Sequence, residues 1–275
     1  MIDIFKNRLR QGHRTSKFPH ETPEFPKRFR GRPRINPSSC PEGCSDCLDI
    51  CPTQALEKKG SEKLALDLGK CLFCGDCARA CPENAVAFTQ DHRLAASRRE
   101  DLLVTLEEAK LAESLNDEMR RLFGRSLKLR QVSAGGCSAC ESELTALGNV
   151  VFDLGRFGIQ FVASPRHADG LVLTGPVTKN MIEPAKIAYQ AIPGPKIVIA
   201  VGACALSGGP FRESPEQNGG AVEAEGRASR APLGETLTLG GAESLGFPIN
   251  LFVPGCPPHP LTILDGLLRL LGKIR

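Results

Sequence analysis

The chain of 275 residues lacks the features of a membrane-spanning, an exported and a nucleic-acid-binding protein. No apolar run approaches the roughly 18 residues that a membrane-spanning helix requires. The first residues, MIDIFKNRLRQGH, carry charges but no apolar segment after them, so they do not form a signal peptide. The net charge is only +4, which argues against a dedicated nucleic-acid-binding protein. We therefore expect an intracellular chain that binds no nucleic acid.

Nucleotide-binding motifs are also missing, because no GxGxxG follows a predicted strand and no P-loop occurs. The positive charge is concentrated in a basic N-terminal segment, residues 1–38, with ten Lys and Arg against three acids. Within it, Ile2, Phe5 and Leu9 share one helical face. Such a helix is predicted to lie at an anionic membrane surface or on an integral membrane partner, with a disordered basic tail as the alternative.

Cysteine, in contrast, is abundant: the chain has twelve. In an intracellular chain they indicate metal ligands rather than disulfides. Eight of them lie in two runs, CPEGCSDCLDICPTQAL (40–56) and CLFCGDCARACPENAV (71–86), which match each other at a spacing of thirty residues. A fixed period of this kind indicates a duplicated unit.

The second run has the CxxCxxCxxxCP spacing of bacterial two-cluster ferredoxins, in which the fourth cysteine binds the neighbouring cluster. We therefore predict an α+β ferredoxin domain over residues 39–98 with two 4Fe–4S clusters. The predicted ligands are Cys40, Cys44, Cys47 and Cys81 for the first cluster, and Cys71, Cys74, Cys77 and Cys51 for the second. Zinc is the alternative, but it prefers two separated CxxC pairs around one ion. The first run opens with CxxxC, and we expect Gly43 to absorb the extra residue in a tight turn.

Residues 99–126 are rich in helix formers, with apolar residues that include Leu102, Leu106 and Met119. This spacing predicts a helical linker of one or two amphipathic helices that ends near Gly124.

From residue 127 to 275, apolar strand-like segments alternate with helical ones. This alternation predicts an α/β, flavodoxin-like domain with a parallel sheet covered on both faces. The expected strands are 127–132, 158–164, 170–175, 196–202 and 250–255, and the expected helices are about 141–148, 180–190 and 260–273.

The remaining four cysteines each follow one of these strands: Cys137, Cys140, Cys204 and Cys256. Ligands of open parallel sheets bind outside the carboxyl ends of the strands, so one rim is expected to collect all four thiols. The flanking glycines Gly135, Gly136, Gly202 and Gly255 would let the backbone approach a bulky cluster. We predict a third 4Fe–4S cluster here. A zinc site is one alternative, and a thioredoxin-type redox pair is another, which leaves the last two cysteines unexplained.

Four segments, GGCSACESEL, SPRHADGLVLTGPVT, VGACALSGG and PGCPPHP, resemble the small cluster-bearing subunit shared by membrane-bound NiFe-hydrogenases of the formate hydrogenlyase type and respiratory complex I. The resemblance covers about residues 127–275, and the spaced pair Cys137/Cys140 is similar to the hydrogenase branch. Residues 1–100, including FRGRPRINP and RREDLLVTL, resemble the ferredoxin-type subunit of the same complexes. The chain thus resembles a fusion of two neighbouring electron-transfer subunits. Residues 210–241 form a longer segment than the family pattern has, and we expect a solvated loop there.

The resemblance implies an electron-transfer subunit of an oxidoreductase complex, with no substrate-converting site of its own. The third cluster would be the proximal one, nearest the catalytic large subunit. Further implied partners are integral membrane subunits and an electron-donor subunit or soluble ferredoxin. The implied location is cytoplasmic, on the inner face of the cell membrane. Two alternatives stay open: a complex I-like subunit that passes electrons to quinone, and a zinc-bound scaffold or assembly protein.

Arg166 is expected to tune the third cluster. The strand 158–164 ends on the same rim and Pro165 fixes the turn, so Arg166 is the first long side chain that could reach inward. A nearby cation stabilises the more negative, reduced form of a cluster and raises its potential. The alternative is that Arg166 pairs with Asp169 and only holds the loop.

Overall fold

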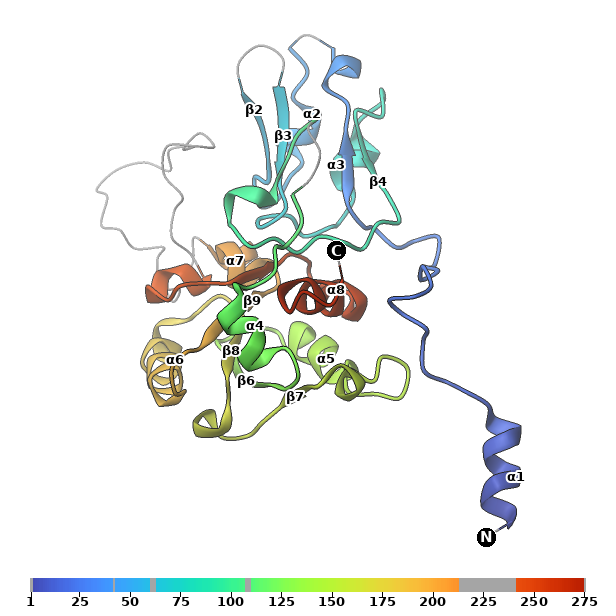
Figure 1. The fold of residues 1–275 in the computed structure, drawn as a ribbon. Helices are drawn as coiled ribbons and strands as arrows, with labels where there is room; N and C mark the ends of the chain where they lie inside the picture. The colour runs from blue at the N-terminus through green and yellow to red at the C-terminus, as the bar shows by residue number, and fades with distance from the viewer. Residues whose placement is uncertain (1, 42, 60–62, 107–109, 213–240, 275) are drawn as a thin grey trace.

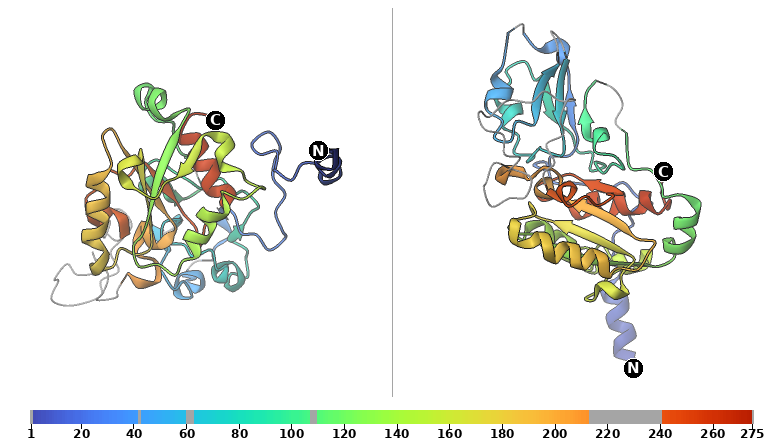
Figure 2. Two further views of the ribbon diagram at one scale, coloured as in Figure 1. Left: turned by 90° about the horizontal axis from the view of Figure 1, so that it is seen from below. Right: turned by 90° about the vertical axis from the view of Figure 1, so that its left-hand side faces the viewer.

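The computed structural model describes residues 2–41, 43–59, 63–106, 110–212 and 241–274. An N-terminal domain with two small antiparallel sheets packs against a second domain built on a parallel sheet (Figure 1). Helix α1 (Ile2–Gln11) projects away from both domains in every view (Figures 1 and 2). Among the described residues, no helix is both long enough and apolar enough to cross a membrane. Apart from its ends, the loop expected at 210–241 lies outside the described residues.

The N-terminal domain repeats one unit, a short helix followed by a turn and a strand. The first unit is α2 (Asp46–Asp49) with β2 (Leu56–Lys59), and the second is α3 (Asp76–Ala80) with β4 (Val86–Phe88). The remaining strands complete two antiparallel sheets: β1 (Pro33–Ile35) pairs with β4, while β3 (Lys63–Asp67) lies between β2 and β5 (Leu103–Val104). The ferredoxin-type fold predicted from the repeated cysteine runs is confirmed.

The linker is helical only in part. Helix α4 (Asp117–Phe123) is capped by Asn116, whose side chain accepts a hydrogen bond from the Met119 backbone N–H. Ahead of α4, Glu100–Leu102 forms a 3-10 turn and β5 then pairs with β3. The predicted helix around Leu102 is wrong, because Leu102 and Val104 are buried in the core of the N-terminal domain. Tertiary packing here overrides a favourable helix propensity.

The second domain contains five parallel strands at the predicted positions: β6 (Leu127–Ser133), β7 (Ile159–Phe161), β8 (Gly170–Thr174), β9 (Ile197–Val201) and β10 (Leu251–Val253). Their spatial order is β10-β9-β8-β6-β7. This is the flavodoxin-like order, in which the chain changes direction across the sheet between β6 and β8. The predicted fold class is confirmed.

Both faces of this sheet are buried, because successive residues of each strand point to opposite sides. On β9, Val198 and Ala200 face one core while Ile197, Ile199 and Val201 face the other. The first core contains buried residues of α6 (Lys179–Ala191) and α7 (Ala203–Ser207), and the second contains those of α5 (Ala139–Ala146) and α8 (Pro260–Leu270). These helices lie on the two faces of the sheet in Figure 2. The first core also includes the apolar residues of the N-terminal domain, so the two domains share it.

Backbone hydrogen bonds also join the two domains. Ala96 and Phe252 exchange two of them, at 3.0 and 2.9 Å, which extends the edge strand β10 toward the linker. The N-terminal segment is tied to the second domain by Arg156, whose guanidinium donates to the carbonyls of Ser16 and Phe18, both at 2.8 Å. These contacts hold the ferredoxin domain in one position over the sheet.

A buried ion pair connects β3 to the linker. Arg99 donates from both terminal nitrogens to both carboxylate oxygens of Asp67, each at 2.7 Å, and the side chains are 7% and 3% exposed. The same carboxylate accepts the Gly69 N–H at 2.8 Å, and the Asp67 carbonyl accepts the Cys71 N–H at 3.1 Å. The ion pair therefore shapes the turn that leads to a predicted cluster ligand.

Replacing Arg99 with Met should destabilise the protein by about 3–5 kcal/mol, because Asp67 would keep a buried and unpaired charge. The exposed neighbour Arg98 gives a matched control, and Arg98→Met should change stability by less than about 0.5 kcal/mol. Urea denaturation followed by circular dichroism measures both variants. Equal midpoints for the two variants would contradict the role of the ion pair.

Candidate metal centres

The first set of thiols combines cysteines from both runs. Cys47 is buried in α2. Burial, followed by the negative charges of Cys40, Cys81 and Cys44, raises the pKa of Cys47 to about 11. Cys81 therefore lies beside thiols of the first run although it belongs to the second. Its Sγ accepts a hydrogen bond from the backbone N–H of Ala85 at 3.2 Å, which stabilises a thiolate.

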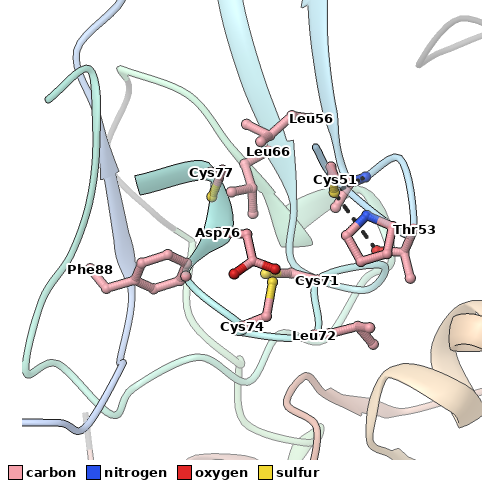
Figure 3. A pocket seen from close by; sticks show the side chains of 13 residues that line it. Cys51, Thr53, Leu56, Leu66, Cys71, Leu72, Cys74, Asp76, Cys77 and Phe88 are labelled. Atoms are coloured by element: carbon pink, nitrogen blue, oxygen red, sulfur yellow. Dashed lines mark hydrogen bonds between the residues drawn. The ribbon is translucent and has the colours of Figure 1, made fainter. Parts of the chain in front are cut away.

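The second set lines one pocket of the N-terminal domain (Figure 3). Its four thiols, Cys51, Cys71, Cys74 and Cys77, share this pocket with apolar side chains that include Leu56, Leu66 and Phe88. Burial is the main cause that raises the pKa of Cys71 to about 12 and that of Cys77 to about 11, and both also lie in the field of Cys51 and Cys74. Backbone N–H groups of Ala55 and Phe73 donate to the sulfurs of Cys51 and Cys71 at 3.2 and 3.3 Å.

The third set lies at the carboxyl rim of the parallel sheet. Cys137 and Cys140 follow β6, Cys204 follows β9, and Cys256 follows β10. Burial raises the pKa of Cys140 to about 12, and the charges of Glu141, Cys204, Cys256 and Cys137 add to this effect in that order. The pKa of Cys204 is also raised to about 12, by burial and then by Cys256 and Cys137. The rim thus brings together the four thiols that were predicted to meet there.

Glycines allow this convergence at two places. A Cβ on Gly175, just after β8, would lie 2.6 Å from the backbone nitrogen of Gly136, so the loop before Cys137 can cross the end of β8 only over bare backbone. A Cβ on Gly202 would overlap the sulfur of Cys140, and Gly202 has a φ of +92°. Both positions therefore require glycine.

The donor sets fit iron–sulfur clusters better than zinc. Each set offers four thiols, the soft ligands that clusters use. In the described part of the chain, no three Cys, His, Asp or Glu side chains converge closely enough to hold a single metal ion. A zinc ion requires its sulfur ligands about 2.3 Å from one point, whereas a 4Fe–4S cube binds each thiolate on a different iron. The raised pKa values mean that these thiols would release protons when they bind metal.

Two thiol pairs connect the three sets. Cys47 of the first set raises the pKa of Cys77 of the second, after burial and the thiols of the second set itself. Cys74 of the second set raises the pKa of Cys256 of the third, after burial and Cys137. The three sets therefore form a line in which the second set lies between the other two.

Arg166 lies in the 3-10 turn Pro165–His167 with an exposed side chain, on the side of the sheet where that turn contacts α6. The nearby Asp169 carboxylate accepts the backbone N–H of Lys128 at 2.7 Å. The tuning role of Arg166 stays a prediction. The sequence analysis missed Glu141, which follows Cys140 directly and is the charge that acts most on that thiol. It also missed the contact of Cys74 with Cys256, for which the sequence contains no signal.

Comparison with known proteins assigns the two domains. Residues 137–270 match the family described as "NADH ubiquinone oxidoreductase, 20 Kd subunit", and residues 39–85 match the "4Fe-4S dicluster domain". The chain belongs to the 20 Kd subunit family, and it carries a 4Fe–4S dicluster domain ahead of the family region. The resemblance inferred from the sequence is confirmed, and iron–sulfur clusters are the cofactors that the dicluster match supports.

Three relatives show the range of the family. The chain is 39% identical over 167 residues to the "Probable membrane-bound hydrogenase subunit mbhJ" of Pyrococcus furiosus, covering 61% of this chain and 87% of that relative. It is 37% identical over 161 residues to formate hydrogenlyase subunit 7 of Escherichia coli, covering 58% of this chain and about half of the relative, 54%. It is 38% identical over 139 residues to a subunit of the NADH-quinone oxidoreductase of Citrifermentans bemidjiense, covering 50% and 68%. The relatives are subunits of oxidoreductase complexes, and this chain is a subunit of that kind.

Replacing Gly202 with Ala should displace Cys140 and remove the metal of the third set, since the new Cβ would overlap that sulfur. We expect the variant to lose about a third of its iron if each set holds a four-iron cluster. Gly148→Ala is the control, because its Cβ would meet only the Thr145 carbonyl, at an ordinary 3.4 Å. Iron analysis and electron paramagnetic resonance (EPR) spectroscopy measure the result. Full iron content in the Gly202 variant would contradict the proposed geometry of this rim.

Proposed function

We propose that the chain is an electron-transfer subunit with three 4Fe–4S clusters, which relays electrons between a donor and the catalytic large subunit of a membrane-bound NiFe-hydrogenase complex of the formate hydrogenlyase type. The observation that carries this proposal is the line of three four-thiol sets within one polypeptide. When bound, the clusters supply one-electron redox chemistry. The chain's own residues hold the clusters in a fixed order and exclude water from their inner sides.

The proposed ligands follow from the grouping of the thiols. Cys40, Cys44, Cys47 and Cys81 hold the first cluster; Cys51, Cys71, Cys74 and Cys77 hold the second; and Cys137, Cys140, Cys204 and Cys256 hold the third. The proximity of Cys77 to Cys47 and of Cys256 to Cys74 supports a path from the first cluster through the second to the third. The donor would meet the first cluster, at the tip of the ferredoxin domain.

The third set is the proposed exit to the large subunit, because two of its thiols face outward. Cys137 and Cys256 are exposed, whereas Cys140 and Cys204 lie deeper in the rim. A partner that covers this rim would bury the cluster and complete its surroundings. In this proposal the chain has no substrate-converting site of its own, and the domain division is 39–98 for the ferredoxin domain and 127–275 for the family domain, joined by 99–126.

Delivery of electrons to quinone is the second candidate function. It is supported by the relative in NADH-quinone oxidoreductase, which is 38% identical, about as similar as the hydrogenase relatives. The spaced pair Cys137/Cys140 favours the hydrogen-linked function. The sequence of the large subunit decides between the two, through the presence or absence of nickel-binding cysteines.

Helix α1 supports a position at the inner face of the cell membrane, beside integral subunits of the same complex. Its apolar side chains are exposed, with Ile2 at 71%, Phe5 at 68% and Leu9 at 83%. No residue of the helix is buried, and Arg8 and Arg10 lie in its last turn. An exposed apolar face with basic neighbours matches an anionic membrane surface.

The proposed function predicts about twelve irons per chain, because each of three clusters contains four. Cys204→Ser should reduce this to about eight and should remove one of three EPR signals, leaving the other two. Iron and zinc analysis of the purified protein, together with EPR of the reduced protein, tests both statements. Stoichiometric zinc with little iron would refute the proposal in favour of a zinc-bound scaffold.

Deleting residues 1–14 should release the assembled complex from membranes more easily, since α1 and its basic flank would be lost. A variant with Phe5→Ser and Leu9→Ser keeps every charge and separates the apolar contribution from the electrostatic one. Membrane fractionation at low and high salt measures the effect, because salt weakens only the electrostatic part. Identical fractionation of all three proteins at both salt concentrations would disprove the role of α1.

A further inference from the structure

Glu141 occupies the point of the sheet where the strand order changes direction. It lies in the first turn of α5, directly after Cys140. Its Oε1 accepts hydrogen bonds from the hydroxyls of Ser133 and Thr174, both at 2.6 Å. These two residues are the last of β6 and β8, the neighbouring strands on either side of the switch point. One carboxylate oxygen therefore joins the ends of both strands under the third set of thiols.

Three features keep this carboxylate ionised. The two O–H···O distances fall in the range of about 2.5–2.7 Å that is typical of a charged acceptor. The Thr174 side chain is fully buried, and its other acceptor, the Val132 carbonyl, is distant at 3.4 Å, so its proton depends on Glu141. The start of α5 also favours a negative charge. Consistently, the two hydroxyl donors hold the pKa of Glu141 below its usual value although burial alone would raise it.

The negative charge acts on the metal ligands. Among charged groups, Glu141 is the largest contributor to the raised pKa of Cys140, and it also raises that of Cys204. Thus two of the four thiols, from different elements of the fold, lie in its field. A reduced cluster carries one more negative charge than an oxidised one, so a fixed anion at this distance disfavours reduction.

We propose that Glu141 is a positioning and tuning residue that lowers the reduction potential of the third cluster relative to the other two. This inference rests on the third cluster of the proposed function. Ser133 and Thr174 hold the carboxylate in place, and the protein thereby makes the rim cluster the hardest of the three to reduce. The effect is opposite in sign to the one predicted for Arg166, and the two side chains can be tested independently.

A purely structural role for Glu141 is the competing explanation, since the carboxylate also ties β6 to β8. Glu141→Gln separates the two roles, because the amide oxygen still accepts both hydroxyl hydrogen bonds but carries no charge. Glu141→Asp keeps the charge and shortens the side chain. Glu183→Gln is the matched control, because it makes the same chemical change at an exposed position of α6.

The experiment is a redox titration of the full chain with its clusters, followed by EPR, after iron analysis has established equal loading of all variants. We expect Glu141→Gln to favour the reduced third cluster about tenfold, which is about 59 mV for a one-electron couple. Glu141→Asp should stay closer to the parent protein, Glu183→Gln should equal it, and the two ferredoxin clusters should not move.

The possible failures are distinguishable. A third signal that is present but has the same potential in Glu141→Gln overturns the tuning role and leaves the proposed function intact. If Glu141→Gln loses the third cluster, the charge-neutral variant Glu141→Met is titrated in its place, and an unchanged potential there overturns the tuning role in the same way. A parent protein with only two cluster signals overturns the three-cluster function and this inference together.

Discussion

The contact between Cys74 and Cys256 is the constraint on which the rest of the structure depends. Electron transfer between centres weakens steeply with distance, so a relay requires the ferredoxin domain to stay close to the rim of the parallel sheet. The shared apolar core, the paired backbones of Ala96 and Phe252, and the N-terminal segment held by Arg156 all serve this placement. The two domains therefore behave as one electron-transfer unit, although each has a fold of its own.

The cysteine sets show how fold and cofactor depend on each other. Burial raises the pKa of Cys71, Cys140 and Cys204 to about 12, so without metal these thiols would stay protonated at neutral pH. Metal binding must remove those protons and offset the repulsion among four thiolates. Backbone N–H donors, such as that of Phe73 to Cys71, and close glycine contacts prepare the sites for this charge. Glu141 adds a further negative charge at the third site, and Ser133 and Thr174 stabilise it there.

Most of the fold could be predicted, because it depends on local patterns. The repeated cysteine runs indicated a duplicated ferredoxin unit, and the alternating apolar segments located all five parallel strands. The linker was the exception. Its helix-favouring composition suggested a helix around Leu102, but Leu102 and Val104 gain more by burial against β3 than the helix could provide. Propensity is a weak local preference, and it is overridden where a neighbouring apolar surface is available.

The sequence by itself determined the chemistry of the sites: twelve thiols, their division into two ferredoxin runs and one rim, and the family to which the chain belongs. Spacing carries this information because ligands of one cluster lie on short loops or at the ends of parallel strands. Only the tertiary structure decided the neighbours of each site. The approach of Cys74 to Cys256, and the carboxylate of Glu141 between the ends of β6 and β8, join residues that are far apart in the chain. Such contacts depend on how two domains and two strands pack, which no local pattern encodes.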